Sequence, residues 1–256
     1  MFKLFFLIFL ISHILGDFYF QSDKLALKKV NSYKNLLLHS LLYLVVLIIC
    51  ILPFWSTPLF ITALILAALH CLIDSCKFVC LVKYKENQVV YFVDQLLHIA
   101  CIIIASIYLT QAGYELHVLS LIMNAYAPVV IDYESILLWA GLVLLLLKPA
   151  NITIMKFMEK YKPVNEHCNN NDNIGEDKST SIDNVGSLIG SLERLIIVLL
   201  MSVGQYAAIG LVLTAKSVAR YNKIAEDKIF AEYYLFRTLT STLYAVLAYS
   251  VIFRLA

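Results

Sequence analysis

Long apolar runs, separated by short polar segments, dominate the hydrophobic pattern of the chain. A helix of about 20 apolar residues crosses the roughly 30 Å hydrocarbon core of a bilayer. Backbone polar groups inside a bilayer must be satisfied within each segment, so these runs are predicted to be helices. Five such helices are expected in the N-terminal part, at residues 2–21, 35–52, 57–81, 88–111 and 131–148.

The pattern changes after the fifth run. Residues 152–161 mix apolar side chains with Lys and Glu, which predicts a helix lying at the membrane interface. Residues 163–184 are rich in Asn, Asp, Glu, Ser and Thr, which predicts a flexible linker. The chain is therefore expected to have a five-span membrane part at 1–162, a polar linker at 163–185 and a C-terminal membrane part at 186–256.

The C-terminal part contains an apolar run that is too long for one untilted span. This run covers residues 188–219 and has Gly204 and Gly210 near its middle. It is expected to form either one long tilted helix or two half-helices joined at a break. A last span at 233–253 completes a predicted all-α, polytopic transmembrane helical bundle of about seven or eight membrane segments.

Composition agrees with an integral membrane protein. Hydrophobic residues make up 61% of the 256 residues, charged residues only 15%, and the mean hydropathy is +0.80. Lys and Arg lie in loops between the apolar runs instead of gathering on one polar face, so no nucleic-acid partner is expected. The partner that the composition predicts is the lipid bilayer. The cysteines form no C-x-x-C motif and are expected to be free thiols.

Loop charge predicts the orientation of the spans. The loops 22–34 and 82–87 carry several Lys residues, as does the segment after the fifth span. The loops 53–56 and 112–134 carry no Lys or Arg. The positive-inside rule then places the basic loops in the cytoplasm and the N-terminus outside.

The first apolar run ends in polar residues rather than in a cleavage site. His13, Asp17 and Gln21 follow one another at four-residue intervals, and no A-x-A pattern comes after them. We therefore expect this run to be a retained first span and not a signal peptide.

Three predicted spans carry a His and an Asp four positions apart, and a fourth carries a single His. Residues at this spacing share one face of a helix, about 6 Å apart. Because consecutive spans run antiparallel, all these positions fall on the cytoplasmic side of the bilayer, where they can converge. The residues are His13, Asp17, His39, His70, Asp74, Asp94 and His98.

This residue set is typical of a metal site. Imidazole and carboxylate groups suit zinc, iron or manganese, so all seven residues are predicted divalent-metal ligands. Asp17, Asp74 and Asp94 are also the predicted catalytic carboxylates. Three polar residues flank the cluster as expected second-layer or substrate contacts: Gln21, Lys77 and Gln95. Two alternatives stay open, namely metal-free hydrogen bonding between helices and a proton relay.

The C-terminal part has polar residues of its own. Glu193 and Arg194 lie within its long apolar run and are expected to form an ion pair within or between helices. The alternative is that Arg194, with Lys216 and Arg220, binds phosphate in a cytoplasmic vestibule.

These motifs resemble the bacterial inner-membrane proteins of the domain of unknown function 3307 family. In the N-terminal half the resemblance rests on His13-x3-Asp17-Phe18-x2-Gln21-Ser22-Asp23, His39-Ser40, His70-x3-Asp74-x2-Lys77 and Asp94-Gln95-x2-His98. In the C-terminal half it rests on Gly190-x2-Glu193-Arg194, Gly204-Gln205-Tyr206-x-Ala208-Ile209-Gly210 and Ala215-Lys216-Ser217-x2-Arg220. It covers nearly the whole chain except the linker. The resemblance implies a polytopic helical fold in the cytoplasmic membrane, and the family implies no established activity.

The leading hypothesis is a metal-dependent hydrolase acting on a phosphoester or amide bond of a lipid-associated substrate. A metal lowers the pKa of bound water toward neutrality. No Ser-His-Asp or Cys-His arrangement is evident, so metal-bound water is the one hydrolytic nucleophile that the sequence supports. More distantly, the H-x-x-x-D and His-Ser elements are similar to those of membrane proteins described as metal-dependent hydrolases. The alternatives are a metal-ion or proton transporter and a non-catalytic scaffold or partner subunit, so whether the chain is an enzyme stays open.

Overall fold

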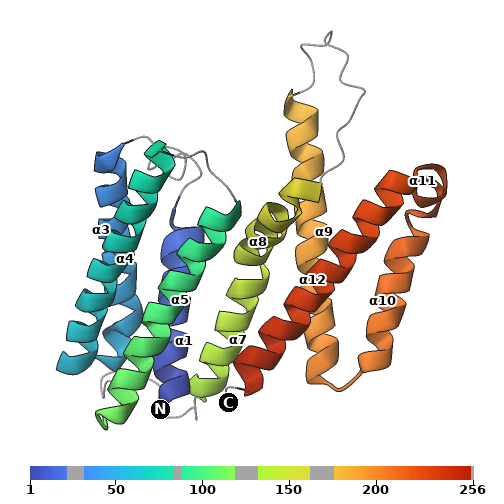
Figure 1. Cartoon of the computed structure of the whole chain (residues 1–256). Helices are drawn as coiled ribbons and strands as arrows, with labels where there is room; N and C mark the ends of the chain where they lie inside the picture. The colour runs from blue at the N-terminus through green and yellow to red at the C-terminus, as the bar shows by residue number, and fades with distance from the viewer. Residues whose placement is uncertain (22–31, 84–87, 119–131, 162–175, 255–256) are drawn as a thin grey trace. The chain divides into compact units, whose positions relative to one another are not determined.

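The computed structural model of the chain describes residues 1–21, 32–83, 88–118, 132–161 and 176–254. Within these ranges the regular structure is helical, with no strand (Figure 1). The predicted all-α fold is therefore confirmed for this part of the chain. Six candidate spans among the described residues are long and apolar enough to cross a membrane. The chain forms two compact units, which divide between Leu144 and Leu145.

The first unit contains the predicted N-terminal spans. A π-helical turn, η1 (Leu15–Tyr19), directly continues the first helix, and a 3-10 turn, η2 (Leu52–Phe54), follows the second. The helices begin and end within a few residues of the predicted limits. They are α1 (Phe2–Ile14), α3 (Tyr33–Ile51), α4 (Thr57–Lys83), α5 (Gln88–Gln111) and α7 (Tyr133–Leu146), whose last residues belong to the second unit.

α1 is the most enclosed of the candidate spans. Every residue from Leu4 to Ile14 is buried, because this helix is apolar on all sides and has neighbours all around it. It packs against α3 and α5, and α4 packs against the same two helices. At its far end, Lys3 forms an ion pair with Glu134 of α7 at 2.9 Å. Because α1 packs against α3 and α5, the polar residues at its C-terminal end lie inside the bundle.

The second unit is built from α8 (Lys148–Met158), the 3-10 turn η3 (Glu159–Tyr161), α9 (Glu176–Ser202), α10 (Tyr206–Val218), α11 (Tyr221–Glu226) and α12 (Lys228–Arg254). α9 and α10 lie side by side as a hairpin (Figure 1). The chain turns at Gly204, whose φ of 73° is favourable for glycine and strained for other residues. Of the two predicted forms of the 188–219 run, the structure has the pair of helices, and Gly210 lies inside α10.

Two segments differ from the sequence prediction. Residues 176–184 lie in the predicted polar linker, but in the structure they form the start of α9. The sequence predicts a separate interfacial helix at residues 152–161. In the structure these residues belong to α8 and η3, which follow α7 after Leu147 and lie with it in one candidate span, Tyr133–Tyr161.

An apolar stripe explains the position of α8. Ala150, Ile154 and Met158 recur every four residues and are buried, with Tyr233 and Tyr244 of α12 packed against them.

The division of the chain predicted at residues 163–185 stays a prediction, because residues 162–175 lie outside the described ranges.

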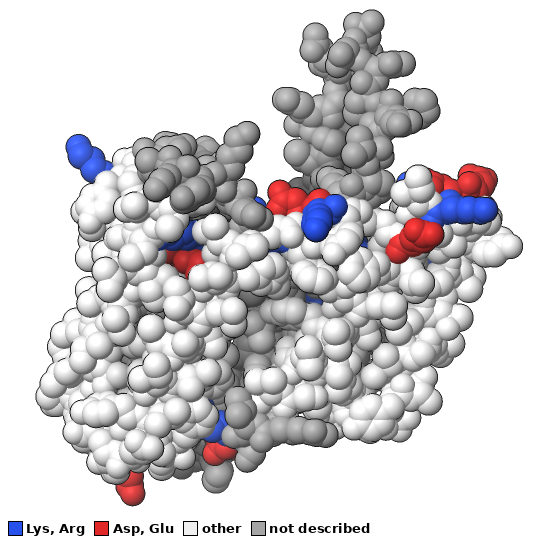
Figure 2. All heavy atoms as spheres, in the orientation of Figure 1, with Lys and Arg blue, Asp and Glu red and all other residues white. Residues whose placement is uncertain are grey.

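The charged side chains follow the ends of the helices. In each unit, those in view in Figure 2 gather near the helix ends and leave a broad, almost uncharged band between them. Such a band is what helices need to face hydrocarbon.

Arg194 holds the second unit together from its interior. This side chain is only 2% exposed, and it donates to the backbone oxygen of Leu146 at 2.8 Å and to Asn151 Oδ1 at 2.6 Å. It also donates to the hydroxyls of Ser191 and Ser241, both at 3.2 Å. The guanidinium thus joins α7, α8, α9 and α12 through neutral acceptors.

Glu193 forms an ion pair between helices, as predicted, whereas Arg194 donates its hydrogen bonds to neutral acceptors. Glu193 pairs with Lys216 across the α9–α10 hairpin. Consecutive helical residues point to different faces, so Glu193 faces α10 while Arg194 faces the interior.

Replacing Arg194 by Met is expected to lower the free energy of unfolding by about 1–3 kcal/mol, because buried acceptors lose their donor. Thermal unfolding of the full chain in detergent measures the effect. Arg237→Met is the matched control, since Arg237 is an exposed arginine of α12 in the same unit. Equal unfolding temperatures for the two variants would contradict a structural role for the Arg194 network.

Candidate metal centre

Four helices of the first unit bring the predicted His and Asp residues together. α1 and α4 run opposite to α3 and α5, so the ends of the first pair meet the beginnings of the second (Figure 1). The cluster consists of His13 from α1, Asp17 from η1, His39 from α3, His70 and Asp74 from α4, and Asp94 and His98 from α5. The expected convergence is present, while the role of these residues as ligands stays a prediction.

Asp17 contacts three imidazoles. Its Oδ1 is 2.8 Å from Nε2 of His70 and 3.3 Å from Nε2 of His39. Its Oδ2 is 3.9 Å from Nδ1 of His13, the residue one turn earlier. One carboxylate therefore links side chains from α1, α3 and α4.

Asp74 and Asp94 extend the cluster. Nε2 of His39 lies 3.4 Å from Asp74 Oδ2, so His39 is shared between two carboxylates. Asp94 Oδ2 accepts a hydrogen bond from Lys77 Nζ at 2.8 Å and one from Gln95 Nε2 at 3.3 Å. Two of the predicted flanking residues, Lys77 and Gln95, thus contact the same carboxylate.

His98 has a defined tautomer. Its Nδ1 is 2.8 Å from the backbone oxygen of Asp94, and a carbonyl oxygen only accepts, so neutral His98 carries its proton on Nδ1. Nε2 then has a free lone pair, and this buried atom has no hydrogen-bond partner among the described residues. The ring centroid lies 4.4 Å from that of His70 and 5.0 Å from that of His13. The lone pair is therefore available inside the cluster to a proton or a metal.

The cluster is almost fully withdrawn from the surface. The seven side chains are at most 7% exposed. Burying a carboxylate without compensation costs several kcal/mol, so three of them in one interior need positive charge close by. Within the described ranges, Lys77 is the one Lys or Arg that forms an ion pair with these carboxylates.

The donor atoms form three overlapping groups that could hold a metal ion. Within each group the ligand atoms lie within 4.8 Å of one another. His70 is common to the first two groups, and Asp74 is common to the last two. The groups are His13 with Asp17 and His70, His39 with His70 and Asp74, and Asp74 with Asp94 and His98. The set of nitrogen and carboxylate donors fits zinc, iron or manganese.

A tyrosine and a glycine, which the sequence did not reveal as site residues, support the cluster. The ring of Tyr43 stacks on that of His70 with centroids 3.7 Å apart. A Cβ on Gly16 would lie 2.7 Å from Cδ2 of Tyr43, so only glycine permits this approach. Gly16 belongs to η1, where the Phe20 N–H donates to the Leu15 oxygen across five residues. Single π-turns of this kind are frequent at functional sites.

The remaining polar candidates lie outside the three groups. Gln21 is buried one turn beyond Asp17, at the end of the first described segment. The His117 side chain is 80% exposed, and His167 lies outside the described residues. The five cysteines in the described ranges are free thiols, as predicted.

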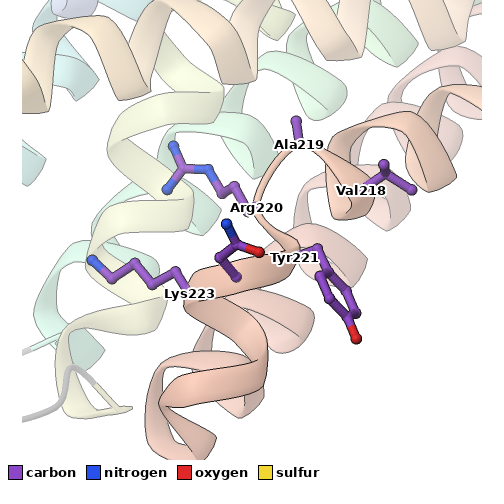
Figure 3. A pocket seen from close by; sticks show the side chains of 6 residues that line it. Val218, Ala219, Arg220, Tyr221 and Lys223 are labelled. Atoms are coloured by element: carbon purple, nitrogen blue, oxygen red, sulfur yellow. The ribbon is translucent and has the colours of Figure 1, made fainter.

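A basic pocket belongs to the second unit. It has a volume of about 270 Å³ and is lined by residues 218–223, between α10 and α11. Figure 3 shows the side chains of Arg220 and Lys223 extending to the same side of the turn. No His, Asp or Glu lines the pocket, so it is not a metal site.

The fold and the cluster define a helical protein with apolar candidate spans and a buried His/Asp centre. The model of the family described as "Protein of unknown function (DUF3307)" matches residues 5–127, and this match supports membership of the family. The resemblance drawn from the N-terminal motifs is thus confirmed, and all seven cluster residues lie in the matched part. The resemblance of the C-terminal half lies outside it and stays a prediction. No curated protein and no solved structure matches the chain.

Replacing Gly16 by Ala is expected to displace Tyr43 from His70 and to lower the free energy of unfolding by about 1–3 kcal/mol. Gly141→Ala is the matched control, because its added Cβ would meet Ile11 and Leu7 at ordinary distances of 3.4 Å and 3.5 Å. Thermal unfolding in detergent compares the two variants. The expectation fails if Gly16→Ala is as stable as Gly141→Ala.

Proposed function

We propose that the cluster of seven residues holds a divalent transition metal, with some of them as direct ligands and the others around the ion, and that the chain is a membrane-embedded metal-dependent hydrolase of a lipid-associated substrate. The observation that carries the proposal is the overlap of three donor groups that share His70 and Asp74. Contacts that only join helices need one donor and one acceptor at each point. Here four imidazoles and three carboxylates converge, which is a ligand set for a cation.

Electrostatics supports this proposal. Three carboxylates lie buried within one cluster, and ionised groups are costly inside a bundle of apolar helices. A divalent cation held by these carboxylates would lower that cost, and metal binding would displace protons from the imidazole and carboxylate groups that hold it.

The chain supplies groups for each step of a hydrolysis. The chemistry that a metal would supply here is a water molecule of lowered pKa and polarisation of the bond to be cleaved. Asp17, His39, His70 and Asp74 would be the direct ligands, because His39 Nε2 lies 3.3 Å from Asp17 and 3.4 Å from Asp74, and His70 Nε2 lies 2.8 Å from Asp17. The free lone pair of His98 Nε2 accepts the proton of the attacking water, and its Nδ1–H stays on the Asp94 carbonyl to hold the ring. Asp94 is held in turn by Lys77 and Gln95.

The substrate class follows from the surroundings of the cluster. All its residues lie on helices that are long and apolar enough to span a membrane. A substrate that reaches such a site from the bilayer has a lipid portion, and a phosphoester at the headgroup level is the bond proposed for cleavage. With the basic loops in the cytoplasm, the site faces that side of the cytoplasmic membrane.

The first test is metal content. The purified full chain is expected to carry zinc, iron or manganese, and His39→Ala and His70→Ala are expected to weaken metal binding at least about tenfold, as loss of a ligand should exceed the effect of outer-layer mutations. Elemental analysis with metal titration measures this. His117→Ala, an exposed histidine of the same chain, is the control and should bind like wild type. Wild-type protein that stays metal-free after incubation with each metal would overturn the proposal.

The second test is activity. A panel of lipid phosphoesters in detergent is expected to reveal metal-dependent hydrolysis, which Asp74→Asn lowers by about a hundredfold or more by removing a shared ligand. Chelation should abolish the activity and the metal should restore it. Hydrolysis that persists in Asp74→Asn or in the presence of chelator would place the chemistry elsewhere.

A second candidate function is proton movement. It is favoured by the close approach of three imidazole rings, since the His13 centroid lies 5.0 Å from that of His98 and 6.0 Å from that of His70. Proteoliposomes loaded with a pH-sensitive dye distinguish the two functions. Proton flux that is independent of metal and lost in His98→Ala would favour the relay over the hydrolase.

A further inference from the structure

The basic pocket of the second unit, lined by residues 218–223, takes no part in the proposed metal chemistry. Arg220 and Lys223 contribute two cationic side chains to it, and both extend to the same side of the turn between α10 and α11 (Figure 3). Glu226 and Asp227 follow in the sequence but do not line the pocket. The groups that this pocket presents are therefore those of a site for an anion.

Aromatic rings of α12 hold the two cations. The guanidinium carbon Cζ of Arg220 lies 5.9 Å from the centroid of the Tyr234 ring, and Lys223 Nζ lies 4.4 Å from that of Phe230. A cation over the face of an aromatic ring is attracted to its electrons. Such a contact orients the cation and leaves N–H groups that can donate to an anion.

The structure also changes which basic residues are candidates for binding phosphate. Of the three expected from the sequence, Arg194 donates to neutral acceptors in the interior of the second unit, and Lys216 pairs with Glu193. Arg220 remains, and the turn after α10 brings Lys223 beside it in the pocket. The phosphate candidates are therefore Arg220 and Lys223.

The pocket lies where an apolar helix ends. No residue of α10 is buried, and the side chains of Leu211 and Val218 are exposed. The first charged residue of this helix is Lys216, in its last turn. In a bilayer, acyl chains cover such an apolar surface, and the basic residues directly after it lie at the level of the headgroups. The anion nearest to the pocket is then the phosphate of a lipid.

We propose that this pocket binds the phosphate of an anionic phospholipid headgroup, with the acyl chains along the exposed side of α10. Arg220 can donate two parallel hydrogen bonds to a phosphate, and Lys223 supplies a compact positive charge. The pocket volume of about 270 Å³ is below the roughly 300–1,000 Å³ of sites for drug-sized ligands, which suits a headgroup and not a whole lipid. The inference does not depend on the proposed hydrolase.

The experiment compares two lipids that differ in headgroup charge. The full chain in detergent is incubated with equal amounts of phosphatidylglycerol, which is anionic, and phosphatidylcholine, which has no net charge, both with the same acyl chains. Gel filtration removes unbound lipid, and mass spectrometry measures the retained lipid per chain. Wild type is expected to retain phosphatidylglycerol over phosphatidylcholine by at least about tenfold, because two cations act on one phosphate.

Two double variants test the pocket itself. Replacing Arg220 and Lys223 together by Gln is expected to abolish the preference for phosphatidylglycerol. The matched control replaces Lys160 and Arg237 by Gln, since both are exposed, belong to the second unit and do not line the pocket. The control loses the same charge and is expected to keep the preference. Equal losses in the two double variants would overturn the proposal, because retention would then follow net charge alone.

Two results on wild type decide the proposal without any variant. Equal retention of the two lipids overturns it. The second result comes from repeating the gel filtration with inorganic phosphate at millimolar concentration in the buffer. Phosphatidylglycerol that stays bound supports a lipid as the ligand. Its displacement assigns the pocket to a soluble phosphate compound instead and overturns the proposal.

Discussion

The burial of three carboxylates inside a bundle of apolar helices is the constraint on which the rest of the first unit depends. Asp17, Asp74 and Asp94 each cost several kcal/mol when withdrawn from water without compensation. Among the described residues, the imidazoles of His39 and His70 and the ammonium of Lys77 approach these carboxylates from neighbouring helices, and His13 and His98 approach them from one turn away on the same helix. Because no helix carries its own compensation in full, α1, α3, α4 and α5 are stabilised only together. The enclosed position of α1 follows from this, because Asp17 contacts His39 of α3 and His70 of α4, and the ring of His13 stacks on that of His98 of α5.

The local backbone is adapted to this cluster. The π-turn at Leu15–Tyr19 continues α1 and carries Asp17, and Gly16 within it admits the ring of Tyr43. Tyr43 in turn stacks on His70, so the orientation of a proposed ligand is fixed by packing as well as by its hydrogen bond to Asp17.

The second unit stabilises its buried charges in a different way. Arg194 is surrounded by neutral acceptors, and Glu193 finds Lys216 on the adjacent helix.

Much of the fold and the membership of the cluster could be predicted from the sequence, because both depend on spacing. Apolar runs gave the helices, and four-residue intervals combined with antiparallel order placed His13, His70 and Asp94 at one level. The partners of Lys77 and the tautomer of His98 could not be predicted, since they depend on the rotation of each helix about its axis and on side-chain rotamers. The close approach of Gly16 to Tyr43 depends on interhelical distance, which spacing does not encode. The helical start of α9 was missed because polar composition alone does not exclude a helix that continues into an apolar run.

The distribution of the cluster over α1, α3, α4 and α5 has a consequence for how the chain is made. The helices emerge from the ribosome in order, and α1 brings a histidine and an aspartate long before α4 and α5 exist. Until those later helices arrive, the polar end of α1 can meet His39 of α3 but not His70 of α4 or His98 of α5. Only the completed four-helix set lets it settle inward. A chain that ended before α4 would lack His70, whose Nε2 lies 2.8 Å from Asp17 Oδ1, so the polar end of α1 is complete only when segments far apart in the sequence have come together.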